Sequence, residues 1–119
     1  MLKTHPYIGA KIEEMSPAGL VQMARNALNE DQYGDCIYFS YRVFMSVATA
    51  FLKSQRIKAD SDEDMLQLFA LHYTDSMGVA SYSSLPAMVY EIHERPGTRD
   101  FARSYFNRCE QFYIDITTA

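Results

Sequence analysis

Apolar residues recur at intervals of three and four along most of the chain, which is the spacing of one face of an α-helix. The clearest case runs from Asp35 to Gln55, where apolar side chains cover more than half of the helical circumference and polar side chains form one narrow stripe. The apolar positions are Ile37, Tyr41, Phe44, Val47, Ala48, Phe51 and Leu52, and the polar stripe holds Asp35, Arg42, Ser46, Thr49 and Lys53. The pattern predicts a long central helix, and we interpret its aromatic residues as core rather than as a base-stacking strip.

Two further helix starts are marked by capping residues. Ser16 is a good N-cap and Pro17 suits the first helical position, so a helix is predicted to begin there. Ser61 is the expected N-cap of the segment "DSDEDMLQLFALHY", and Asp64 follows three residues later in an arrangement like a capping box. Between the first and the central helix, the stretch "DQYGD" is expected to form a short turn.

The last part of the chain predicts two more helices around a Pro-Gly break. A shorter helix is expected from about Ser84 to Arg95, ahead of Pro96 and Gly97. The final helix is predicted to start at Thr98 and to run towards Ile116. Its expected core face holds Phe101, Tyr105, Cys109, Phe112 and Ile116, and the opposite face holds Arg99, Arg103 and Glu110. No strand-like alternation is seen, so the predicted class is all-α, a four- to five-helix up-and-down bundle.

Length and composition fit one folded domain. The chain has 119 residues, of which 48% are hydrophobic and 22% are charged, which is enough apolar material for a sizeable core. We expect residues 16–119 to form the single domain and residues 1–15 to form an N-terminal arm or a short helix. The formal net charge is −4, so any binding of phosphate groups must be local rather than driven by the charge of the whole chain.

Cysteine usage and hydropathy predict a cytoplasmic protein. Cys36 and Cys109 lie inside apolar helical patterns without metal-ligand or redox-motif spacing, so we interpret them as buried free thiols in a reducing compartment. The first residues lack the apolar stretch of a signal peptide, and no run approaches the ~20 apolar residues of a membrane span. We therefore expect no contact with a membrane.

The spacing of potential ligands argues against a metal centre. Glu91 and His93 are two positions apart and point away from each other on a helix, whereas a di-iron bundle needs glutamate and histidine three apart. His72 has no carboxylate at a suitable interval, and we interpret it as a packed or boundary residue. We predict no metal and no cofactor, and the sequence singles out no catalytic residue.

One polar stretch, "HERPGTR", is the candidate binding site. In the functional interpretation its histidine and arginines, with one more arginine a turn later, surround a phosphate or an RNA backbone near the start of the last helix. In the alternative interpretation the stretch is a solvated corner between helices, whose positive charges are neutralised by nearby acids. The candidate anion-binding residues are His93, Arg95, Arg99 and Arg103, and the neutralising acids are Glu91, Glu94 and Asp100.

The run "ARNALNEDQYGDCIYFSYRVFMSVATAFLKSQRIKA" resembles the first two helices of HEPN domains, with an alanine-rich helix, a Tyr-Gly-Asp turn and a long aromatic helix. The order of the later elements is also similar, so the likeness covers about residues 20–116. HEPN domains are small all-α bundles of the prokaryotic nucleotidyltransferase-associated and toxin families. Their ribonuclease members carry an arginine four to six residues before a histidine near the last helix. That order is absent here, because the nearest approach is His93 followed six residues later by Arg99.

These observations lead to a binding function rather than a catalytic one. The resemblance implies a non-catalytic HEPN-like bundle that acts as a protein-binding or assembly module, either as a homodimer or with a protein partner such as a nucleotidyltransferase. The rival hypothesis is an RNA- or nucleotide-handling HEPN variant of the ribonuclease toxin type, which would use His93 with Arg95 or Arg99. A third hypothesis is a helical adaptor that holds an amphipathic helix of a partner in a groove.

Overall fold

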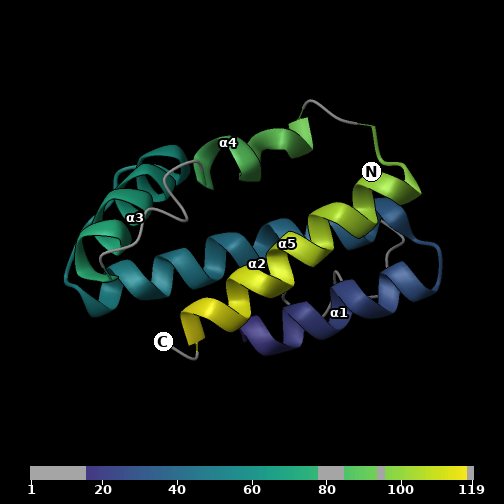
Figure 1. Cartoon of the computed structure of the whole chain (residues 1–119), viewed down its shortest axis with the longest axis horizontal. Helices are drawn as coiled ribbons and strands as arrows, with labels where there is room; N and C mark the ends of the chain where they lie inside the picture. Colours follow the sequence, from purple (N-terminus) through teal and green to yellow (C-terminus); the bar gives the residue numbers. More distant parts are fainter. Residues whose placement is uncertain (1–15, 78–84, 94–95, 118–119) are drawn as a thin grey trace.

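The computed structural model describes residues 16–77, 85–93 and 96–117, so the expected N-terminal arm lies outside the described residues. In the described ranges the chain forms five α-helices and one short 3-10 helix, with no strand, and the predicted all-α class is confirmed there. The elements are α1 (Pro17–Asn29), α2 (Tyr33–Ser54), α3 (Asp62–Met77), α4 (Leu85–Val89), η3 (Tyr90–His93) and α5 (Arg99–Thr117) (Figure 1).

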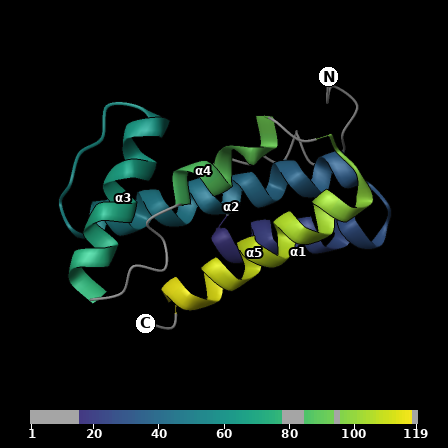
Figure 2. The same ribbon diagram turned by 45° about the horizontal axis from the view of Figure 1, so that its top comes forward.

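Helix α2 is the centre of the bundle. Helices α1 and α5 pack against α2 and against each other, whereas α3 packs on α2 and on α4. The view in Figure 2 shows α3 and α4 on one side of α2 and α1 and α5 on the other. The predicted central position of this helix is therefore confirmed.

Aromatic side chains connect the two sides of the bundle. Phe44 of α2 lies with its ring centroid 5.4 Å from that of Tyr105 and 5.3 Å from that of Phe112, both on α5. Phe112 in turn meets Phe69 of α3 edge-on at 5.4 Å. Such tilted and edge-on pairs add to the stabilisation that comes from burying the rings. Of the core positions predicted on α2, Ile37, Phe44, Val47, Ala48 and Leu52 are buried, and Tyr41 and Phe51 are half-buried.

Hydroxyl caps begin the first and last helices, and the first of these caps is the one that the sequence predicts. The Ser16 hydroxyl accepts a hydrogen bond from the backbone N–H of Gly19 (3.1 Å). The Thr98 hydroxyl accepts from the N–H of Phe101 (3.2 Å), so α5 begins one residue after the predicted start. Each cap satisfies a backbone donor that has no partner inside the helix.

The start of α3 resembles a capping box, with one difference. The Ser61 hydroxyl accepts from the backbone N–H of Asp64 (3.1 Å), as expected for an N-cap. The Asp64 carboxylate reaches one residue further back than in the usual arrangement and accepts from the N–H of Asp60 (3.0 Å). The acidic residues here therefore serve the helix start, where negative charge is favourable.

The connection between α1 and α2 is shorter than the sequence predicts. Asp31 adopts a positive φ of 61°, and the N–H of Gln32 bonds to the carbonyl of Ala27 (2.8 Å), which ends α1 in a tight left-handed turn. Because this turn is complete at Gln32, α2 begins at Tyr33, and Gly34 lies in its first turn. The prediction that "DQYGD" as a whole is a turn was wrong, because the left-handed turn is made at Asp31 and the last three residues of the stretch are already helical.

The predicted helix from Ser84 to Arg95 is only partly regular in the described residues. It forms an α-helix over Leu85–Val89 and then tightens into the 3-10 helix Tyr90–His93. The Tyr105 hydroxyl donates to the carbonyl of Val89 at 2.7 Å. In a continued α-helix that carbonyl would accept from the backbone N–H of His93, so the tertiary contact competes with the helical one.

Candidate functional site

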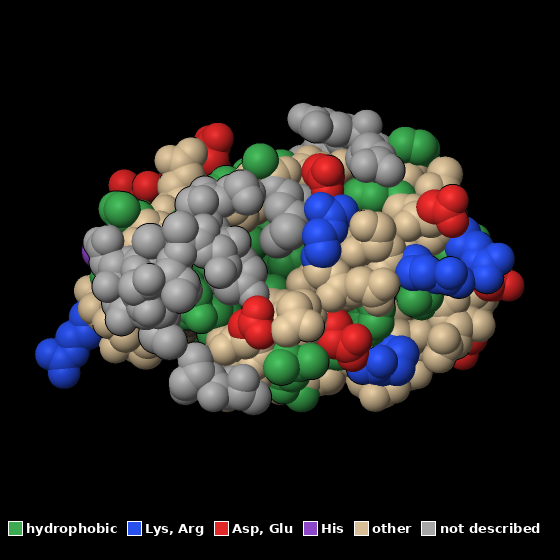
Figure 3. All heavy atoms as spheres, viewed as in Figure 1, with side chains coloured by type: hydrophobic (Ala, Val, Ile, Leu, Met, Phe, Trp, Pro, Cys, Tyr) green, Lys and Arg blue, Asp and Glu red, His purple; other side chains and the backbone are tan. Residues whose placement is uncertain are grey.

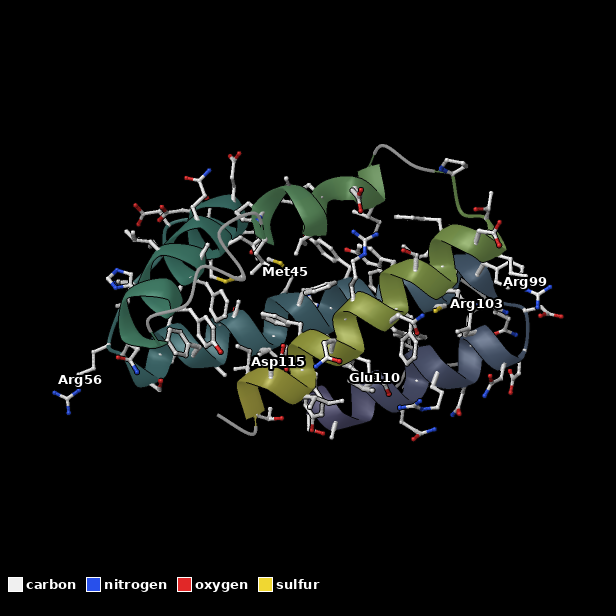
Figure 4. The ribbon with its side chains drawn as sticks, in the orientation of Figure 1. Met45, Arg56, Arg99, Arg103, Glu110 and Asp115 are labelled. Carbon is white, nitrogen blue, oxygen red and sulfur yellow. The ribbon has the colours of Figure 1, made fainter. Side chains whose placement is uncertain are left out.

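Two of the four predicted anion-binding residues can be placed with their side chains. Arg99 and Arg103 are exposed on the first turns of α5, and Figure 4 shows both at the end of the molecule where this helix begins. His93 ends η3, but its side chain and the whole of Arg95 lie outside the described residues. Figure 3 shows several basic side chains at the same end of the molecule, with acidic ones among them.

The start of α2 contributes a tyrosine to this region. The Tyr33 hydroxyl donates to the carboxylate of Asp31 at 2.9 Å. This hydrogen bond raises the pKa of Tyr33, and the charges of Arg99 and Arg103 act on the same hydroxyl in the opposite direction. The two arginines are therefore close enough to the Tyr33 hydroxyl for their charges to act on it, although they come from a distant part of the sequence.

The acids expected to neutralise the arginines are arranged differently. Glu91 forms an ion pair with Arg108 at 2.8 Å, which ties η3 to the middle of α5. Asp100 is exposed in the first turn of α5, and Glu94 lies outside the described residues. Within the described ranges, no carboxylate forms an ion pair with Arg99 or Arg103.

The sulfur nucleophiles are sealed in the core between α2 and α5. Cys36 and Cys109 are free and buried, as the sequence predicts. Burial raises the pKa of the Cys36 thiol to about 11 and raises that of Cys109 further still. The Ser40 hydroxyl lies beside both thiols and is the buried polar side chain of the described core. Thiols in this state are inert, because the thiolate is the reactive form.

The described residues show no group of three or more His, Cys, Asp or Glu side chains that could hold a metal ion. His72 is half-buried on α3, in the boundary position expected for it. In the same part of the chain, none of the helices is long and apolar enough to cross a membrane.

Two hollows beside α2 were not foreseen from the sequence. The first, which we call the α2 hollow, has a volume of about 340 Å³ and is lined by Arg42, Met45, Ser46, Thr49, Lys53 and Asp62. The second, the α2–α3 hollow, has a volume of about 400 Å³ and shares Thr49, Lys53 and Asp62 with the first. The signal in the sequence was the polar stripe on α2, which we had not interpreted as a site.

Comparisons of the chain with protein-family models, with curated protein sequences and with solved structures found no match. The structure itself establishes a helical bundle, and the resemblance to HEPN domains is compatible with that architecture.

Proposed function

We propose that this chain is a non-catalytic, HEPN-like helical bundle that serves as a protein-binding and assembly module and that it forms a dimer. The observation that carries the proposal is Leu71, whose residue surface is 57% exposed on the outer side of α3. A leucine that is exposed to water is unfavourable, and covering it with a partner lowers the free energy of the assembly.

The outer side of α3 is apolar at more than one position. At ~100° per residue, Leu71 points away from the buried face of α3, and the half-buried Leu68 lies one turn before it on the same flank. On α5, Ile114 is likewise 44% exposed and turned away from the buried Phe112. Apolar side chains of this kind fit the buried centre of a protein interface, which is more apolar than the rest of the protein surface.

The state of the reactive groups supports binding rather than catalysis. The thiols of Cys36 and Cys109 are buried, and the Tyr105 hydroxyl is engaged with the carbonyl of Val89. Free buried thiols are also stable in a reducing compartment, which supports a cytoplasmic location. A second copy of the chain is the partner we favour, with a nucleotidyltransferase as the alternative that the HEPN resemblance implies.

Analytical ultracentrifugation of a surface variant tests the proposal. We expect the wild-type chain to sediment as a dimer at micromolar concentration and Leu71→Glu to shift it to the protomer, because a carboxylate would be desolvated in the interface. Gln32→Glu adds the same charge at an exposed position that makes no side-chain cap bond, and it should leave the dimer intact. A protomer at all concentrations, or a dimer that tolerates Leu71→Glu, would contradict the proposal.

The second candidate function is the handling of RNA or a nucleotide at His93, Arg95 and Arg99. It is supported by the exposed Arg99 and Arg103, which have no carboxylate partner in the described residues and lie near Tyr33. If this function is correct, His93→Ala abolishes RNA cleavage or nucleotide binding without unfolding the chain. Unchanged behaviour of that variant would rule this function out.

A further inference from the structure

The α2 hollow has the size and the mixed lining of a small-molecule site. Its volume of about 340 Å³ lies within the range of roughly 300–1,000 Å³ that such sites occupy. Met45 forms an apolar part of the wall, and Figure 4 shows it on the side of α2 that faces α3 and α4. Arg42, Ser46, Thr49 and Lys53 line it from α2, and Asp62 lines it from the first turn of α3.

Arg42 is the residue that points to a ligand. Its side chain is half-buried, and its Nε atom is shielded from solvent and has no hydrogen-bond acceptor. In the described part of the chain, no carboxylate forms an ion pair with this guanidinium. A buried polar group without a partner costs free energy, and a positively charged one costs more. The Nε–H itself would keep no acceptor, but an oxyanion bound to the outer guanidinium nitrogens would offset the cost of the half-buried positive charge, because such hydrogen bonds are strengthened by both charges.

The other groups from α2 extend the site in one direction. Ser46, Thr49 and Lys53 follow Arg42 at intervals of four, three and four residues, so all of them lie along one side of the helix. At 1.5 Å per residue the backbone distance from Arg42 to Lys53 is about 16 Å. A ligand that is held by its anionic group at Arg42 therefore meets the two hydroxyl groups first, and Lys53 lies at the far end of the stripe.

Asp62 and the absence of a stacking surface narrow the class of ligand. A carboxylate in the wall disfavours a simple anion, but it is a good acceptor for ligand hydroxyl groups. None of the described residues that line the α2 hollow is aromatic, so the hollow offers no ring on which a flat base could stack. We propose that the α2 hollow binds a small phosphorylated polyol such as a sugar phosphate, with the phosphate on Arg42 and the hydroxyl groups on Ser46, Thr49 and Asp62.

The site is independent of the assembly proposed above, because none of its residues is Leu68, Leu71 or Ile114. Because an unpaired, half-buried charge costs free energy, the proposal also predicts how the stability of the free protein responds when this charge is removed. Removing the charge of Arg42 should remove ligand binding and leave the denaturation midpoint of the free protein unchanged or higher. A residue that merely supports the fold would show the opposite behaviour.

Isothermal titration calorimetry with glucose 6-phosphate tests the proposal on the full chain. We expect saturable binding by the wild-type protein and weakening by about tenfold or more in Arg42→Gln, as the loss of a charge-assisted contact implies. Arg56→Gln makes the same change in a side chain that points away from the molecule in Figure 4, and it should leave the affinity within about twofold. Ser46→Ala and Thr49→Ala should each weaken binding severalfold.

Further ligands separate the outcomes. Glucose tests the need for the phosphate, inorganic phosphate tests the need for the polyol, and adenosine monophosphate tests the exclusion of a flat base; all three should bind more weakly than glucose 6-phosphate. The proposal is overturned by any of four results: no saturable binding of glucose 6-phosphate up to about 10 mM, undiminished binding by Arg42→Gln, a lower denaturation midpoint of that variant, or tighter binding of one of the other three ligands.

Discussion

The unit formed by α1, α2 and α5 differs from the flank formed by α3 and α4 in how its helices are covered. Each helix of the three-helix unit packs against the other two, and Arg25 of α1 joins Glu110 of α5 in an ion pair while lying over the Phe106 ring. Helix α3 rests on α2 and α4 and exposes Leu71. The hollows also lie on the α3 side of α2. The comparison shows that the three helices of the unit cover one another, whereas α3 leaves Leu71 exposed, as the binding function proposed above requires.

The largest expected effect comes from breaking the aromatic contact between the two regions. Phe112 is fully buried and touches both Phe44 and Phe69, so Phe112→Ala should lower the free energy of unfolding by about 3–5 kcal/mol. Phe51→Ala on the flank side should cost roughly half as much, because the Phe51 ring is only half-buried against Phe69 and Tyr73. Urea denaturation measures both. Equal losses would show that the flank is packed as tightly as the three-helix unit.

A smaller effect should follow from the thiols sealed in the three-helix unit. Burial raises the pKa of Cys36 from its ordinary value of 9.0 to about 11, so the folded state keeps a proton that the unfolded state releases. Stability contributed by this group is therefore complete below about pH 9 and declines as the pH rises towards 11. By pH 10.5 the loss from Cys36 alone should be about 2 kcal/mol.

Urea midpoints measured at pH 8 and pH 10.5 test this sign. Cys36→Ala should show a smaller decline between the two pH values than the wild type, even if it is less stable at both. A decline that is the same in the two proteins would show that the Cys36 thiolate is tolerated in the core.

The smallest expected effect is a gain of stability at the start of α2. A Cβ added at Gly34 would meet no atom within 4 Å, and Gly34 lies in a helix, so Gly34→Ala should stabilise the chain by about 0.5–1 kcal/mol. Gly97→Ala is the matched control, because this glycine lies outside the helices and its Cβ would make only an ordinary contact with Ile37. A loss of stability in Gly34→Ala would place the glycine in a turn, as the sequence alone had predicted.

The sequence predicted the helix faces and the hydroxyl caps well, because both depend on residues close together in the chain. The inward positions from Ile37 to Leu52 and the caps at Ser16 and Ser61 are examples. It missed what depends on distant partners. Asp31 adopts a left-handed conformation, which the sequence did not indicate for this non-glycine residue. The end of α4 depends on the hydrogen bond from the hydroxyl of Tyr105 to the carbonyl of Val89.

The candidate site was foreseen only in part for the same reason. Arg99 and Arg103 were identified from their place at a helix start, but the proximity of Tyr33 required the fold. The α2 hollow could not be found from the stripe of Arg42, Ser46, Thr49 and Lys53 alone, because its other wall comes from Asp62 on α3. A polar stripe on a helix predicts a solvent-exposed face, and the sequence alone does not show that a neighbouring helix forms a second wall beside it.

The most direct test of the assembly function is sedimentation velocity of the wild-type chain with a short labelled RNA, at low and at physiological salt. The account predicts a dimer at micromolar protein and RNA that sediments as if alone at both salt concentrations. A protomer that carries the RNA with it, more weakly as salt rises, would contradict the account. Because phosphate contacts show that salt dependence, this result would assign the function to Arg99 and Arg103 instead.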